Sequence, residues 1–263
     1  MNSTQQLTNT GRADAAAPSR ALAAAVAFHR LPLLAIAAAL TVGLFALSGN
    51  DVPFPASGYG ALYILPVNIL SLVLVRWLVH REGGRLRDLI GFSRKRLGRD
   101  ILWGLLWLMV LYFPFVLAIM GTMFALYGAE LFTQFEAVFA PSPEAVPILP
   151  FAASLTLAIV LFVTFTPLNA PVEEVVYRGY AQRNLGSPTW FAILLPAIAF
   201  GIQHMFFSPT LPGMVVYGVA FFVWSVVGGI IYAKQRRLMP LIVAHVLVNL
   251  FTSAPALVVP FLV

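Results

Sequence analysis

Uncharged runs of about 20 residues, separated by short polar breaks, recur along the chain from Leu31 to Val263. A helix needs roughly 20 apolar residues to cross a membrane, whereas a barrel strand needs only about 10 that alternate with polar ones. The runs are too long and alternate too poorly for barrel strands. The pattern therefore predicts an all-α fold, a polytopic transmembrane bundle of about 7–8 helices. The predicted spans are 31–49, 58–79, 101–127, 150–172, 189–206, 214–233 and 239–263, and Pro255 leaves open whether the last is one span or two.

The first 28 residues differ from the rest of the chain, because they are rich in Ala, Ser, Thr and Gln and contain few large apolar side chains. Such a segment cannot bury enough apolar surface to fold alone. We therefore expect a flexible tail over 1–28 and a transmembrane domain over 29–263. His29 and His80 stand beside Arg30 and Arg81 at the predicted ends of two spans, where we expect both histidines at the membrane interface.

Composition agrees with a membrane protein. Hydrophobic residues make up 60% of the chain and charged residues 10%, with a mean hydropathy of +0.88, which excludes an ordinary soluble domain. The chain has no cysteine, so disulfides, thiolate metal sites and cysteine nucleophiles are excluded.

The net charge of +6 predicts orientation in the membrane rather than a nucleic-acid partner, because the basic residues lie beside the spans. They occupy the tail and the segments between spans two and three, four and five, and six and seven. Basic segments stay cytoplasmic, so we expect an integral membrane protein with a cytoplasmic N-terminus and membrane lipids among its partners.

Ionisable side chains within apolar spans cost about 2.5–3.5 kcal/mol each at mid-span, so the few that occur are candidates for function. They gather in the C-terminal half of the chain, as Glu173, Glu174, Arg178, His204 and His245, and the polar Asn249 lies in the same span as His245.

The two glutamates require different roles, because neighbouring helix residues point about 100° apart. Glu174 and Arg178 have the i,i+4 spacing of an ion pair along one helix face. Glu173 is left to face the bundle interior as a candidate general base.

His245 and Asn249 are also four residues apart, which presents two donors side by side to a developing oxyanion. His204 lies on another helix and can share the water or move its proton. One carboxylate, two imidazoles and an amide suffice for peptide hydrolysis. The alternatives without chemistry are a glutamate–arginine cluster at the interface, a His204 bonded to a backbone carbonyl across helices, and interhelical hydrogen bonding by His245 and Asn249.

Three motifs carry a resemblance to a known family. They are Glu-Glu-x-x-x-Arg starting at Glu173, Phe-x-x-x-His from Phe200 to His204, and His-x-x-x-Asn from His245 to Asn249. In this order and at these intervals the chain resembles the CAAX protease and bacteriocin-processing (CPBP) family, also called the Abi or type II CAAX prenyl endopeptidases, over a catalytic core of about 150–263.

The resemblance implies an intramembrane endopeptidase of the glutamate type, acting on a membrane-associated peptide or protein, in a bacterial inner membrane. In it Glu173 activates water, His204 assists, His245 and Asn249 stabilise the oxyanion, and Glu174 and Arg178 support them. No cofactor is favoured. Glu173, His204 and His245 remain possible ligands of zinc, since the family was long described as metalloproteases.

Other protease chemistries are excluded, because the chain has no Gly-x-Ser-x-Gly turn and no Asp within a predicted span. A non-catalytic protein of the same fold, such as a bacteriocin-immunity factor or scaffold, and a proton-coupled transporter stay open as alternatives.

The predicted spans leave one conflict, because Glu173 lies at a span end while His204 lies ~21 Å into the next span from the same side. We expect Pro167, Pro171 and Pro196 to bend or shorten these helices so that the groups meet.

Overall fold

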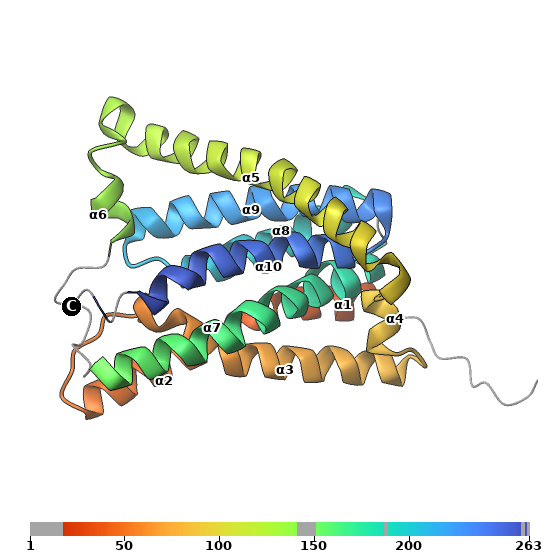
Figure 1. Cartoon of the computed structure of the whole chain (residues 1–263), viewed down its shortest axis with the longest axis horizontal. Coiled ribbons are helices and arrows are strands. Elements are labelled where there is room, and N and C mark those ends of the chain that lie inside the picture. Colours follow the sequence, from red (N-terminus) through yellow and green to blue (C-terminus); the bar gives the residue numbers. More distant parts are fainter. Residues whose placement is uncertain (1–17, 141–150, 187–188, 259–260, 262–263) are drawn as a thin grey trace, which may run out of the picture.

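The computed structural model describes residues 18–140, 151–186, 189–258 and 261, and every regular element in this part of the chain is a helix (Figure 1). Five helical stretches are long and apolar enough to cross a membrane: Arg20–Leu47, Leu62–Arg81, Leu86–Glu130, Phe151–Gln182 and Leu211–Gln235. Two shorter apolar helices, Trp190–Met205 and Met239–Ser253, complete the bundle. The predicted all-α transmembrane fold is confirmed, and the chain is an integral membrane protein.

The helices follow one another in a simple order. The N-terminal half contains α1 (Arg20–Phe28), α2 (Arg30–Leu47), α3 (Gly60–Arg81), α4 (Leu86–Ile90), α5 (Leu97–Tyr127) and α6 (Phe135–Phe139). The C-terminal half contains α7 (Phe151–Glu174), a π-helical segment (Val175–Gln182), α8 (Trp190–Met205), α9 (Leu211–Gln235) and α10 (Met239–Ser253). A 3₁₀ turn over Ala254–Leu257 ends α10, so the helix stops before Pro255.

The first helix begins earlier than predicted. Ser19 caps α1 by accepting a hydrogen bond from the backbone N–H of Leu22 at 3.1 Å, and Ala23 and Ala27 are fully buried. His29 has right-handed helical backbone angles, so α1 and α2 together form the stretch Arg20–Leu47. The prediction of a flexible tail therefore fails for residues 20–28, while residues 1–17 lie outside the described part.

The fourth span is also longer than predicted. The sequence placed its end at residue 172, before the first charged residue, but the helix continues to Gln182, and all eight residues of its π-helical segment are buried. The helix is continuous through Pro167 and Pro171, and α8 through Pro196. Glu173 is therefore followed by nine further helical residues. This extension, rather than a shortening at proline, brings the glutamate to the depth of α8.

Helices α8 and α9 pack with their backbones in direct contact. A Cβ atom added at Gly201 would lie 2.6 Å from the carbonyl oxygen of Gly218, so only glycine fits there. One turn after Gly201, the close approach places the ring of His204 on that of Phe221.

The two ends of the bundle differ in charge. In Figure 1, α4 and the connection from α9 to α10 lie at one end, and α6 lies at the other. At the first end, Arg237 donates to both carboxylate oxygens of Asp100 at 2.6 Å and so ties this connection to α5. The basic loop 81–99 and the basic turn 236–237 therefore share one side, as the predicted topology requires.

A labelling experiment tests the predicted orientation. We expect a membrane-impermeant maleimide added outside intact cells to label Glu136→Cys and not Lys95→Cys, because basic segments are retained in the cytoplasm. Both positions are exposed and the native chain has no cysteine, so the unsubstituted protein is a clean control. Labelling of position 95 alone would reverse the topology.

Candidate active site

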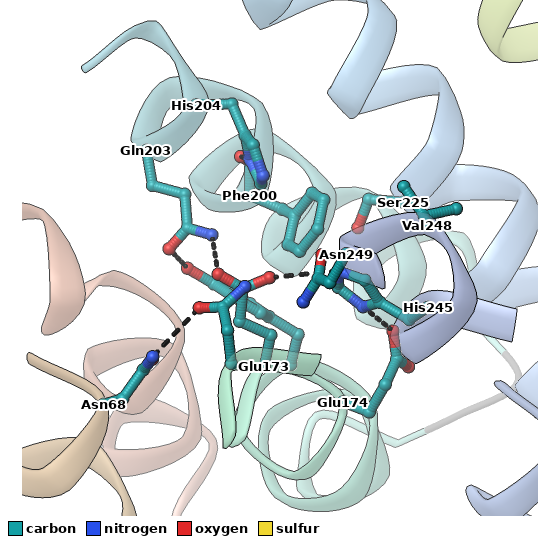
Figure 2. A network of polar contacts seen from close by, with 12 residues as sticks. Asn68, Glu173, Glu174, Phe200, Gln203, His204, Ser225, His245, Val248 and Asn249 are labelled. Carbon is teal, nitrogen blue, oxygen red and sulfur yellow. Dashed lines mark hydrogen bonds and ion pairs between the residues drawn. The ribbon is translucent and has the colours of Figure 1, made fainter. Parts of the chain in front are cut away.

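Glu173 lies at the centre of a buried polar network, and its side chain is fully buried (Figure 2). Its Oε1 atom accepts hydrogen bonds from Gln203 Nε2 at 2.7 Å and from Arg30 Nη2 at 3.2 Å. Its Oε2 atom is buried, has no hydrogen-bond partner and lies 3.5 Å from His245 Nε2. The two oxygens of one carboxylate are thus in different environments.

Glu174 shares His245 with Glu173 and has Arg178 as a partner of its own. Its Oε1 atom lies 3.3 Å from Arg178 Nη1 and 3.0 Å from His245 Nδ1. The i,i+4 ion pair predicted from the sequence is therefore present in the structure. The Arg178 guanidinium also bonds Ser225 and lies over the ring of Phe200 at 4.9 Å. Arg178 is thereby held on several sides.

His245 and Asn249 lie one turn apart on α10, as their spacing predicts, and both are buried. His245 contacts both glutamates, through Nδ1 on one side and Nε2 on the other. Asn249 Nδ2 is buried and has no hydrogen-bond partner. In the view of Figure 2 the Asn249 side chain is drawn over the contact between Glu173 and His245. A buried donor without a partner costs about 1–3 kcal/mol, which favours a role in binding a further group.

His204 is held more tightly than the sequence indicates. Its Nδ1 atom lies 2.7 Å from the carbonyl oxygen of Phe200, one turn earlier in α8, and its ring stacks on Phe221 with centroids 3.6 Å apart. The expected alternative of a carbonyl on another helix is therefore wrong, since the carbonyl belongs to the same helix. The Phe200 ring contacts the rings of both His204 and His245. No hydrogen bond joins His204 to Glu173 within the described residues, and its Nε2 atom is left for another partner.

The sequence analysis missed the most buried charge in the N-terminal half. Arg30 is fully buried and donates to Glu173, Gln203, Asn68 and Ser71. The sequence did contain a sign of this cluster, because Arg30, Asn68 and Ser71 are polar residues in or next to apolar runs. Their partners, however, lie up to 173 positions away in the sequence.

His29, which was expected at the membrane interface, bonds within the bundle. Its Nε2 atom lies 2.9 Å from Ser71 Oγ, and its Nδ1 atom lies 2.6 Å from the carbonyl oxygen of Val26. The ring is partly buried because α1 continues the first span by ten residues before Arg30.

The residues considered as zinc ligands do not form a ligand set. Among the described residues, no group of three or more His, Asp and Glu side chains is arranged to hold a metal ion. Glu173 Oε1 is bound by the guanidinium of Arg30, and both ring nitrogens of His245 lie against carboxylates.

The comparisons with known proteins locate a family in the C-terminal part of the chain. Residues 152–251 match the family model described as type II CAAX prenyl endopeptidase Rce1-like. The match confirms the resemblance seen in the sequence. It covers all six predicted site residues but neither Arg30 nor Asn68. No curated protein and no solved structure matched the chain.

Proposed function

We propose that the chain is a glutamate-type intramembrane endopeptidase that hydrolyses a peptide bond in a membrane-associated peptide or protein. One observation carries the proposal: Glu173 Oε2, a buried acceptor without a hydrogen-bond donor, and Asn249 Nδ2, a buried donor without an acceptor, belong to the same polar network around His245. A water molecule and a substrate carbonyl supply the partners that these two atoms lack.

The reaction follows from these positions. Glu173 Oε2 removes a proton from water, and the oxygen of that water attacks the carbonyl carbon of the scissile peptide bond. The oxygen that becomes negative accepts hydrogen bonds from Asn249 Nδ2 and His245 Nε2. Glu173 then passes its proton to the leaving amine as the C–N bond breaks. His204 Nε2 holds the attacking water.

Glu174 and Arg178 act through His245. A carboxylate only accepts hydrogen bonds, so His245 Nδ1 must carry the proton that it shares with Glu174. Nε2 then donates to the oxyanion when the ring carries both protons, and the glutamates on either side balance its charge. Arg178 keeps Glu174 in place for this contact.

A scaffold or immunity factor without chemistry is not favoured by this site. Glu173 Oε2, Glu174 Oε2 and Asn249 Nδ2 are buried without a hydrogen-bond partner, a cost that a purely structural network avoids. Such costs are typical of sites that bind a substrate.

A cleavage assay tests the proposal. Purified protein in lipid nanodiscs is incubated with a library of peptides from solubilised membrane proteins, and the products are analysed by mass spectrometry. A farnesylated peptide that ends in a CAAX sequence, and the same peptide without the farnesyl group, are included to define the substrate class. We expect new peptide termini that are absent from nanodiscs carrying Glu173→Gln. A library left intact by correctly folded protein would contradict the proposal.

Metal removal should leave the activity unchanged. Protein stripped by a chelator is expected to keep its full kcat, because the water is activated by Glu173 and not by an ion. The measurement is kcat before chelation, after chelation and after addition of Zn²⁺, together with the metal content of the active protein. Loss of activity with stoichiometric zinc, and its return when zinc is restored, would require the zinc mechanism instead.

A further inference from the structure

The two oxygens of Glu173 have separate roles in the network. Oε1 receives two donors, Gln203 Nε2 and Arg30 Nη2, whereas Oε2 receives none. We propose that Arg30 and Gln203 are positioning residues that fix the catalytic base through Oε1 and so reserve Oε2 for the water proton. This inference rests on the proposed function and adds to it residues that act through Glu173.

Arg30 is placed by a set of acceptors from three other helices. Its Nε atom donates to Gln203 Oε1 at 2.9 Å on α8, and its Nη2 atom donates to Asn68 Oδ1 at 2.9 Å on α3 and to Glu173 on α7. Its Nη1 atom reaches Ser71 Oγ at 3.3 Å. The guanidinium is a rigid planar fork, so acceptors in these directions define one orientation of the side chain.

The orientation of Asn68 joins this set to α7 a second time. Asn68 Nδ2 donates to Asn169 Oδ1 at 3.1 Å, which turns Asn68 Oδ1 towards Arg30. Asn169 precedes Glu173 by one turn on α7, so the two residues share a helix face. Arg30 and Asn68 therefore hold α7 at two successive turns and fix the rotation that aims Glu173.

The amide of Gln203 also has only one suitable orientation. Its Oε1 atom accepts from Arg30 Nε and from the hydroxyl of Tyr177 at 2.7 Å, so its Nε2 group faces Glu173. A flipped amide would set an oxygen against the carboxylate and an NH₂ group against two donors. Arg30 thus supplies one donor to Glu173 directly and orients the other.

A structural role alone accounts poorly for this arrangement. Burying an ion pair costs desolvation energy that apolar packing avoids, so a buried pair is weak evidence for stabilisation. Here the guanidinium comes from α2, outside the segment 152–251 that matches the protease family, yet it bonds the proposed base. The N-terminal helices therefore complete the active site.

The test compares conservative variants in nanodiscs, using a peptide cleaved by the wild-type protein. Arg30→Lys keeps the buried positive charge but cannot donate in three directions at once as the guanidinium does. We expect kcat to fall by about 10²-fold with KM unchanged, because a small displacement of the base is sufficient for such a loss. Gln203→Ala should cause a loss of similar size, and the double variant a loss clearly smaller than the product of the two, since both act through Oε1.

Arg237→Lys is the matched control. It makes the same substitution at a second arginine that bonds a buried carboxylate, at the end of the bundle remote from the network. We expect it to lower the melting temperature while kcat stays at the wild-type value.

Wild-type kcat in folded Arg30→Lys, or single losses that multiply in the double variant, would overturn the inference. If Arg30→Lys does not fold, the kcat of Gln203→Ala tests the inference, because this substitution removes no charge. A wild-type kcat in folded Gln203→Ala would then overturn it. Normal turnover by Glu173→Gln would instead overturn the proposed function, so the two failures are distinguishable.

Discussion

Glu173→Gln is expected to abolish peptide hydrolysis, because an amide cannot accept the proton of the attacking water. Loss of a general base typically costs about 10²–10⁴-fold, and we expect a loss at the upper end because the described network offers Oε2 no substitute. The change also leaves the charge of Arg30 buried without its carboxylate, which costs about 3–5 kcal/mol. Activity must therefore be measured per folded molecule.

A charge-compensated variant separates catalysis from folding. Arg30→Gln with Glu173→Gln removes both members of the buried pair, so we expect it to recover much of the lost melting temperature and none of the lost turnover. Glu174→Gln is a second comparison: it deprives Arg178 and His245 of an acceptor, and should lower stability and activity together. Turnover by folded Glu173→Gln at the wild-type rate would show that the base is another group.

Asn249→Ala is expected to lower kcat by about 10²–10³-fold with little change in KM, because it removes one oxyanion donor. The measurement is kcat and KM per folded molecule, with the melting temperature as the check on folding.

Thr252→Ala is the matched control on the same helix. Its hydroxyl bonds only backbone carbonyls of α10, those of Val248 and Asn249, and the residue is exposed. It should leave kcat unchanged. Equal losses of kcat in Thr252→Ala and Asn249→Ala would point to a disturbed helix rather than a missing oxyanion donor.

The local parts of the site were predictable from the sequence. The pairing of Glu174 with Arg178 and the placement of His245 beside Asn249 depend on a spacing of four residues, which any helix enforces. The spans were predictable because burial in lipid requires long apolar runs.

The ends of the helices and the distant partners were not predictable. The span of α7 continues past Glu173 because its polar residues find partners on other helices, such as Ser225 for Arg178 and Gly229 for Gln182. α1 has few large apolar side chains, but small residues such as Ala23 suit close packing. Arg30 and Glu173 are 143 positions apart, so only the folded chain reveals their contact.

The most direct test of the central claim is peptide hydrolysis in H₂¹⁸O by wild-type and Glu173→Gln protein in parallel nanodiscs. For the wild type we predict new C-terminal carboxylates that contain one oxygen from the solvent, because water attacks the peptide carbonyl directly. We predict no such termini for Glu173→Gln. Labelled termini at equal yield from both proteins, or none from the folded wild type, would contradict a glutamate-activated water in this membrane protein.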